Sequence, residues 1–427
     1  MNIIYNASTN LMQGFLRLYG KCLSRRAHRK FSRFVKGQQG LIEKIRTDMA
    51  SADRTRPTVW FHCASLGEYG VARPLIAAVK AKGPVNVVLT FFSPSGYEAL
   101  AQRHPDIDYL YYLPLDTRRN ANAFLDAVRP DRAVFMISEY WPNYLRALKF
   151  RAIPTFLVSA IIRDNSQFFK WYGKTYRNAL SAFHHIFVLN EASRFNLNML
   201  GYDEVTVSGD ALFDNASLVA ATPWHDEVIA RFTEGRPTFI AGSISDLNDE
   251  RLIQRLIEEN PDTSFILVPH DVDPAHIERM RRIAGPAESV ACYSELTLLP
   301  EAASRARVLI IDCIGKLAYL YRYGTWAYVG GGFTPLLHSV IEATVYGLPV
   351  SFGPRIERKV TPTQLVDLGI GAIVTTPEGL CRWFESLKSN PVALAEIKER
   401  AAGFVARNEG ATQSIVNKIT SGLWAND

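Results

Sequence analysis

The chain lacks most of the features that mark secreted, zinc-binding or membrane-spanning proteins. Its 427 residues include only five cysteines, which are scattered and form no C-x-x-C pair. This argues against a disulfide framework and a zinc site and is typical of a reducing compartment. No run approaches the ~20 consecutive apolar residues that cross a bilayer. The N-terminus also lacks the basic region and small-residue cleavage site of a secretory signal, so we expect no translocation.

The first 40 residues contain no aspartate or glutamate. They contain eight basic residues: Arg17, Lys21, Arg25, Arg26, Arg29, Lys30, Arg33 and Lys36. Since the formal net charge of the whole chain is +6, the remainder is nearly neutral. Apolar residues recur here at helical spacing, at Leu11, Phe15, Leu18, Tyr19 and Leu23. We therefore predict that residues 1–48 form an amphipathic basic segment that contacts an anionic membrane surface. The alternative is a helix packed on the body with a solvated charged face.

From residue 58 onward, short apolar runs rich in β-branched residues alternate with helix-compatible stretches. The first series of runs is 59–63, 85–91, 109–113, 133–137, 155–158, 186–189 and 205–207. Residues 211–236 break the rhythm, and a second series follows: 238–241, 265–268, 308–311, 327–329, 349–352 and 372–374. Buried strands alternating with helices predict parallel sheets covered on both faces. We therefore predict an α/β protein with two doubly wound, Rossmann-like domains, residues 49–215 and 216–427. We expect them to face each other across a cleft that binds ligands at the carboxyl ends of the strands.

Two polar stretches follow predicted strands of the first domain. In the first, Ser65-Leu-Gly67-Glu68 places a carboxylate in the first turn of a helix. Such a glutamate can act as a general base toward a hydroxyl nucleophile, although the helix dipole favours a glutamate there in any case. In the second, Glu139 and Trp141 stand close together and could line a polyol pocket, the alternative for the tryptophan being a core position.

The second domain carries two glycine-containing turns. Gly330-Gly331-Gly332 follows a predicted strand and precedes His338, Ser339 and Glu342. Glycines let the backbone approach a ligand, Ser339 is predicted to cap the next helix, and a helix N-terminus binds phosphate. Glu342 would then accept hydrogen bonds from a ribose. The turn at Ala241–Ser243 offers donors for a phosphate or sugar, or is a simple strand-to-helix turn.

In this order, these stretches resemble the Kdo (3-deoxy-D-manno-octulosonic acid) transferases of lipopolysaccharide synthesis, from about residue 57 to 375. The matching motifs are Cys63–Glu68 (A-A-S-x-G-E in the family), Phe91–Gly96 (T-x-T-P-[ST]-G), Glu139–Asn143 (E-L-W-P-N), Val207–Asp214 (V-x-G-[ND]-x-K-[FY]-D), Ala241–Ser243 (A-G-S) and Gly331–Pro354 (G-G-S…H-N-x-x-E…G-P). The basic, apolar N-terminus also resembles the membrane-anchoring start of the family.

The resemblance implies a GT-B fold and transfer of Kdo from CMP-Kdo to a lipid A precursor, with inversion and with neither metal nor other cofactor. It implies an enzyme at the cytoplasmic face of the inner membrane, with Glu68 as the catalytic base. The implied donor-binding residues are Ser243, His270, Gly331, Gly332, His338, Ser339 and Glu342. The implied acceptor-binding residues are Ser65, Gly67, Ser95, Glu139 and Arg163.

The chain departs from the family pattern in several places. Val268-Pro269-His270 stands where the family has V-P-R-H-P, so His270 would replace an arginine that meets donor charge. Where the family has M-E-T-E, this chain keeps only the second glutamate, Glu139. Arg163 is the shifted counterpart of a family arginine. Arg358 and Lys359 stand near the place where the family usually has N-F. These departures leave two alternatives open: an inverting GT-B enzyme that uses a different nucleotide sugar on a lipid, and a catalytically silent lipid-binding scaffold.

Two further classes are disfavoured. No G-x-G-x-x-G motif follows a predicted strand, which argues against a nicotinamide-dependent oxidoreductase. The excess of basic residues is confined to the N-terminus rather than spread over a domain, so we expect no nucleic-acid partner.

Overall fold

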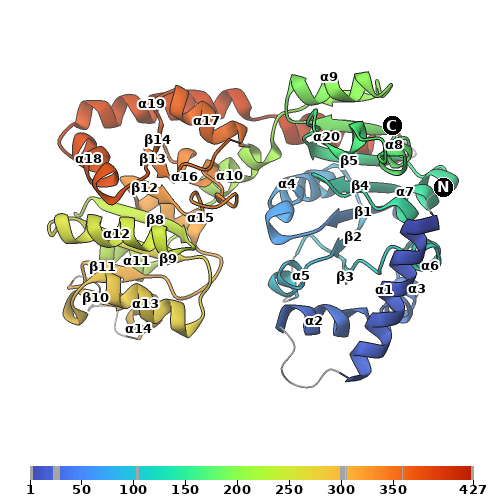
Figure 1. Ribbon diagram of the computed structural model, residues 1–427, viewed down its shortest axis with the longest axis horizontal. Coiled ribbons are helices and arrows are strands. Elements are labelled where there is room, and N and C mark those ends of the chain that lie inside the picture. The colour runs from blue at the N-terminus through green and yellow to red at the C-terminus, as the bar shows by residue number, and fades with distance from the viewer. Residues whose placement is uncertain are drawn as a thin grey trace. The chain divides into compact units, whose positions relative to one another are not determined.

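The computed structural model describes residues 3–22, 29–101, 105–298, 303, 305–357 and 359–424 (Figure 1). The chain forms two compact units, Met1–Asn215 with Glu409–Asp427, and Ala216–Asn408. The second predicted domain, 216–427, is therefore too long at its C-terminal end. Helix α20 (Ala411–Thr420), red in Figure 1, packs against α4 (Leu66–Lys82) of the first unit, because its apolar face completes the core on that side of the sheet.

The first unit is built on a seven-stranded sheet whose strands all pair in parallel, in the order β3-β2-β1-β4-β5-β6-β7. Its strands are β1 (Thr58–Cys63), β2 (Asn86–Phe91), β3 (Tyr109–Tyr112), β4 (Arg132–Met136), β5 (Thr155–Ala160), β6 (His185–Val188) and β7 (Val205–Val207). The helices after α4 are α5 (Pro94–Leu100), α6 (Arg118–Val128), α7 (Pro142–Phe150), η1 (Gln167–Phe169), α8 (Lys174–Leu180), α9 (Glu191–Met199) and α10 (Ala211–Ala221), the last of which crosses into the second unit.

Helices cover both faces of this sheet, as continuous apolar strands require. On one face, α3 (Leu41–Ala50), α6, α7 and α8 bury their apolar residues against side chains such as Trp60. On the other face, α4, α5 and α20 pack against side chains such as Val59 and Phe61. Strand order reverses between β1 and β4, so the loops that leave these two strands lie at the switch point where such folds bind ligands.

The second unit repeats the arrangement, with the strand order β10-β11-β9-β8-β12-β13-β14. Its strands are β8 (Thr238–Ile244), β9 (Ser264–Pro269), β10 (Val290–Cys292), β11 (Val308–Ile310), β12 (Trp326–Val329), β13 (Val350–Phe352) and β14 (Gly371–Ile373). Its helices are α11 (Glu227–Thr233), α12 (Leu247–Glu259), α13 (Pro274–Ala284), η2 (Ala287–Ser289), α14 (Tyr293–Leu296), α15 (Leu317–Leu320), η4 (Tyr321–Tyr323), α16 (Ile341–Thr344), α17 (Val360–Asp367), α18 (Pro377–Lys388) and α19 (Pro391–Asn408). The switch point lies between β8 and β12, and the prediction of two doubly wound domains is confirmed.

The N-terminal segment contains α1 (Ile3–Cys22) and α2 (Arg29–Gln38) besides α3. Helix α1 is tied to the first unit by Tyr5, whose hydroxyl donates to Asp116 Oδ2 at 2.6 Å. The side chains of residues 15–22, 29 and 30 and all of residues 23–28 lie outside the described part. The predicted amphipathic face, and with it membrane contact by residues 1–48, therefore stays a prediction. Within the described residues, no helix has the length and apolar character needed to span a bilayer.

Candidate functional site

In the first unit, the predicted base lies where β1 runs into α4. Ser65 caps α4, its Oγ accepting the backbone N–H of Glu68. The Glu68 carboxylate turns back and accepts the backbone N–H of Ala64 at 2.5 Å. This arrangement is close to a capping box, so Glu68 also stabilises the start of its own helix. The same contact fixes the carboxylate at the carboxyl end of β1.

Two effects raise the proton affinity of Glu68, and a third opposes them. Burial and then the negative charge of Glu139 raise its pKa from 4.5 to about 8, against the opposing hydrogen bond from Ala64. Burial and both carboxylates also raise the pKa of the Cys63 thiol, which therefore stays protonated. A carboxylate that is partly withdrawn from water and beside a second one binds a proton strongly, as a general base near neutral pH must.

Glu139 is held by Trp141 and by His62, of which the sequence did not single out His62. Glu139 Oε2 accepts the indole N–H of Trp141 at 2.6 Å and lies 3.2 Å from His62 Nε2. His62 is fully buried in β1, and its Nδ1 lies 2.9 Å from the hydroxyl of Thr90. Trp141 and Glu139 are thus joined by a direct hydrogen bond, and the polyol pocket that they could line stays a prediction. The backbone just before them is strained, since Ile137 has φ +56°, which β-branched residues rarely adopt.

The other predicted acceptor residues lie shortly after neighbouring strands, at the same edge of the sheet. Ser95 follows β2, and that loop is bonded to the β1 loop by the N–H of Ser93, which donates to the Ala64 carbonyl at 2.8 Å. Arg163 follows β5 and lines a pocket of about 210 Å³ together with Ser138, Tyr140 and Phe168. A side chain at Gly67 would meet nothing closer than Ser65 Oγ at 3.8 Å, so packing does not require glycine there.

A larger pocket of about 740 Å³ lies elsewhere in the first unit. It is lined by α2, α3 and the start of α6, including Gln38, Leu41, Arg46 and Arg119. It contains none of the predicted site residues and does not lie at the carboxyl ends of β1 and β4. We therefore place the candidate site at the strand ends, where the paired carboxylates are.

In the second unit, the glycine run after β12 packs tightly on neighbouring backbone. A side chain on Gly330 would collide with the carbonyl oxygen of Ser243, and one on Gly332 would lie 2.5 Å from the backbone nitrogen of Gly353. Gly331 has φ +83°, a left-handed conformation that favours glycine. Ser243 itself has φ +55°. Ser243, Gly331 and Gly332, all predicted donor residues, are thus brought together at the ends of β8 and β12.

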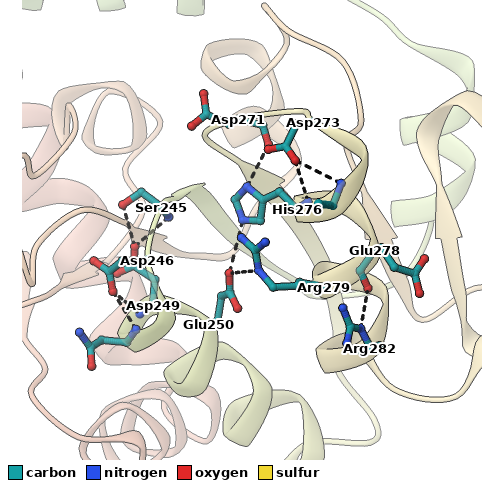
Figure 2. Close-up of polar contacts among 12 residues, drawn as sticks. Ser245, Asp246, Asp249, Glu250, Asp271, Asp273, His276, Glu278, Arg279 and Arg282 are labelled. Atoms are coloured by element: carbon teal, nitrogen blue, oxygen red, sulfur yellow. Dashed lines mark hydrogen bonds and ion pairs between the residues drawn. The ribbon is translucent and has the colours of Figure 1, made fainter. Parts of the chain in front are cut away.

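Asp249, on α12, fixes both of these turns. One carboxylate oxygen accepts the N–H and hydroxyl of Ser245 and the N–H of Gly331, at 3.0, 3.2 and 3.0 Å. The other accepts the hydroxyl of Tyr328 at 2.6 Å. Asp249 is fully buried, and Figure 2 shows its carboxylate directed at Ser245. It was not predicted, because its partners lie in separate loops.

A second buried network positions the loop after β9. Glu250 Oε1 lies 3.2 Å from Arg279 Nε and 3.5 Å from His276 Nε2, and His276 Nδ1 lies 2.9 Å from the Asp271 carbonyl (Figure 2). Next to Asp271, the ring of the exposed His270 lies against that of His338, with centroids 4.5 Å apart and the ring planes tilted by 32°.

Burial, His270 and Lys359 lower the pKa of His338 to about 4, so this imidazole is neutral at pH 7. The predicted donor residues His270 and His338 are therefore adjacent, and His338 carries no charge for an anionic donor.

The prediction for Ser339 is wrong in one respect. The helix that follows begins at Ile341, its N-cap is Val340, and no side chain caps it. Helix α16 is only four residues long, and Gly347, in the turn that follows it, has the left-handed φ of +78°. Ser339 therefore caps no helix, and so short a helix does not make the predicted phosphate site. Glu342 lies in α16, where burial raises its pKa to about 7.

Two basic residues, Arg355 and Lys359, lie beside the glycine turn. The sequence left undecided which residue takes the place of the missing family arginine. A pocket of about 310 Å³ is lined by Pro335, Arg355, Glu357 and Lys359. The N–H of Arg355 donates to the Gly332 carbonyl at 2.8 Å, which ties this pocket to the glycine run. Arg358, named with Lys359 in the sequence, lies outside the described residues.

A carboxylate pair after β9 is not among the predicted motifs. Asp271 and Asp273 stand two residues apart, a spacing that can ligate a metal. Asp273 Oδ1 instead caps α13 by accepting the N–H groups of Ala275 and His276, both at 3.1 Å. Among the residues that the structure describes, no group of three or more His, Cys, Asp or Glu side chains is placed to hold a metal ion.

Comparison with solved structures places this fold among known two-domain enzymes. A UDP-N-acetylglucosamine 2-epimerase superposes with a TM-score of 0.61 at 14% identity, covering 87% of this chain and 97% of that one. MurG of Acinetobacter baumannii superposes with a TM-score of 0.50 at 14% identity, covering 86% and 99%. At such identities the likeness shows the fold alone, and it confirms the predicted GT-B type of fold.

Sequence comparison finds similarity to one family of transferases. The family model described as 3-deoxy-D-manno-octulosonic-acid transferase (kdotransferase) matches residues 33–215. The 3-deoxy-D-manno-octulosonic acid transferase of Bordetella pertussis is 26% identical over 411 residues, which are 91% of this chain and 93% of the relative. That of Haemophilus influenzae is 24% identical over 380 residues, 84% of this chain and 86% of the relative. The chain is similar to the Kdo transferases over most of its length, as its motifs predict.

Proposed function

We propose that the protein transfers Kdo from CMP-Kdo to a lipid A precursor of the lipid IVA type, with inversion at the anomeric carbon of Kdo. The reaction would take place at the cytoplasmic face of the inner membrane during lipopolysaccharide synthesis. Similarity to Kdo transferases over most of the chain supports the donor and the acceptor class. The single observation that carries the mechanism is the half-buried carboxylate of Glu68, held at the carboxyl end of β1 by the N–H of Ala64.

Glu68 is proposed as the general base. It removes the proton of an acceptor hydroxyl while the hydroxyl oxygen forms a bond to the anomeric carbon. The bond from that carbon to the CMP phosphate breaks, and CMP leaves with the bonding electrons. A pKa near 8 makes Glu68 a far stronger base than an ordinary carboxylate, and a fraction of about one tenth is already ionised at pH 7. Glu139, Ser65, Gly67, Ser95 and Arg163 are proposed to bind the acceptor.

The second unit is proposed to bind the donor. Ser243, Gly331 and Gly332 offer backbone and hydroxyl groups at the ends of β8 and β12. His270, His338, Ser339 and Glu342 complete the proposed donor set. Arg355 and Lys359 are proposed to replace the family arginine that His270 does not provide, because they bring permanent positive charge beside the glycine turn. Positive charge there would stabilise the developing charge on the leaving phosphate.

A mass-spectrometric product assay tests this function. The full-length protein is incubated with CMP-Kdo and a lipid A precursor, and in parallel with UDP-sugars and the same acceptor. We expect a product that carries Kdo from CMP-Kdo alone. The absence of any Kdo-bearing lipid under conditions in which the protein remains folded would refute the proposal.

The altered donor motif favours one alternative, a GT-B enzyme that uses another nucleotide sugar. Since only a ligand that binds the native state raises the melting temperature, thermal shifts with CMP-Kdo and with UDP-sugars separate the two. Stabilisation by a UDP-sugar but not by CMP-Kdo would select the alternative. A chain stabilised by neither nucleotide sugar would instead fit the silent lipid-binding scaffold.

A further inference from the structure

The connection between β5 and α8 exposes an unusual group of aromatic side chains. Phe169, Trp171 and Tyr172 are 37%, 91% and 55% exposed. Phe168, beside them, points inward and is 2% exposed. Large aromatic side chains gain free energy by leaving water, so three exposed ones within four residues mark a surface that contacts something else. We call residues 169–174 the aromatic ridge.

The exposure of the aromatic ridge is built into the fold. Arg177 Nη1 donates to the carbonyls of Phe168 and Lys170, at 2.6 and 3.2 Å, and so holds the backbone of the connection against α8. Gly173 lies so close to the Gln167 carbonyl that a side chain there would collide with it. The ring of Phe168 meets Tyr140 edge-on, with centroids 5.0 Å apart. The chain is thus pinned on its inner side while the outer aromatics point to solvent.

The charge around the aromatic ridge is positive. Lys170 and Lys174 are both exposed and flank Trp171 and Tyr172. Between residues 160 and 190 the only acidic residue is Asp164. Tryptophan and tyrosine have an apolar body and a polar edge that suit the headgroup level of a bilayer, and lysines beside them reach anionic phosphates. The combination fits the surface of an anionic bilayer.

We propose that the aromatic ridge is a bilayer-interface anchor that binds anionic phospholipid headgroups. It is separate from the predicted N-terminal basic segment. The same connection supplies Arg163 and Phe168 to the 210 Å³ pocket that also includes Ser138, next to Glu139. An anchored ridge would hold this pocket at the depth where the headgroup of a lipid acceptor lies. This role in positioning the acceptor rests on the proposed function, whereas the binding of the ridge to lipid does not depend on the proposed function.

Co-sedimentation of the full-length protein with vesicles tests the anchor. Vesicles contain phosphatidylcholine alone or with 30% phosphatidylglycerol, and no nucleotide sugar is added. We expect the Trp171→Ser/Tyr172→Ser double variant to bind the anionic vesicles on the order of tenfold more weakly than the wild type. Phe150→Ser is the matched control, because Phe150 is also 91% exposed but lies at the end of α7. Circular dichroism and melting temperature verify folding.

Two further readouts keep the proposal falsifiable. Brominated lipids should quench tryptophan fluorescence in the wild type, and Trp171→Phe should bind as well as the wild type but lose most of this quenching. Lys170→Gln/Lys174→Gln should weaken binding to anionic vesicles only. The anchor is refuted if the double serine variant binds as tightly as the wild type, or if the Phe150 variant loses as much binding.

Transfer to an acceptor dispersed in detergent separates the two proposals. We expect the double serine variant to retain transfer there while losing vesicle binding. A wild-type protein that binds vesicles through the ridge but transfers no Kdo would refute only the proposed function.

Discussion

Replacing Glu68 by glutamine should stabilise the first unit at alkaline pH while it removes the proposed base. In the folded protein the pKa of Glu68 is about 8, against 4.5 for an ordinary glutamate. Between these values the folded chain keeps a proton that the unfolded chain has released. The contribution of Glu68 to the free energy of unfolding is therefore greatest below about pH 4.5, and it is lost as the pH rises through 8. Glutamine has no proton to lose, so the variant escapes this penalty.

The magnitude follows from the size of the shift. A rise of 3.5 pH units corresponds to about 5 kcal/mol, since each unit is worth about 1.4 kcal/mol. Of this, about 4 kcal/mol falls between pH 5 and pH 9. Because Glu68 is partly exposed, solvent reduces the expected effect to about 2 kcal/mol. The hydrogen bond from Ala64 remains available to the glutamine oxygen, so the capping contact is kept.

Urea unfolding at pH 5 and pH 9 measures this difference, followed in the first unit by hydrogen exchange of peptides from β1 and β2. The gain of the variant over the wild type should grow by about 2 kcal/mol between the two pH values. Glu43→Gln serves as control, because its side chain is 75% exposed, and it should show no such growth. A Glu68→Gln variant whose advantage is the same at both pH values would refute the raised pKa and the reasoning built on it.

Three further predictions concern the same sites. The transfer rate of the wild type should rise with pH and level off above about pH 8, and Glu139→Gln should move this rise to lower pH in a pH–rate profile, because the neighbouring negative charge is gone. Asp249→Asn should destabilise the second unit by about 2–4 kcal/mol in urea unfolding and should weaken CMP-Kdo binding. The reason is that an amide cannot accept all the hydrogen bonds from Ser245, Gly331 and Tyr328. The control is Asp262→Asn, at an exposed position, which should change neither stability nor binding. Gly332→Ala should lower the melting temperature, because its side chain would lie 2.5 Å from the Gly353 nitrogen, whereas Gly14→Ala, with nothing within 4 Å, should not.

The strands were predictable because burial on both faces of a parallel sheet leaves continuous apolar runs. Each of the thirteen predicted runs corresponds to a strand. The structure has one further strand, β10 (Val290–Cys292), at the edge of the second sheet, which the prediction missed. The apolar face of α20 was also visible in the sequence, but the surface that it covers was not. A helical pattern says that one face is buried and does not say against which unit.

The site was predictable where it follows strand ends and unpredictable where it depends on contacts between distant loops. Glu68 and the glycine run follow strands directly, so their place was clear. His62 lies in the middle of a buried strand and resembles a core residue. A histidine there nevertheless needs polar partners, and that requirement is the one sequence signal that could have found its link to Glu139. Asp249 and Arg355 gained their roles only when separate loops came together.

Single-turnover transfer measures what Glu68 contributes to the chemical step. CMP-Kdo saturates the enzyme, and the first-order rate of product formation is compared between wild type and Glu68→Gln, with donor binding and folding measured on the same samples. We expect a rate at least about a hundredfold lower in the variant, with donor binding unchanged, because a positioned base accelerates a reaction about 10²–10⁴-fold. A variant that transfers Kdo within tenfold of the wild-type rate would contradict this role of Glu68.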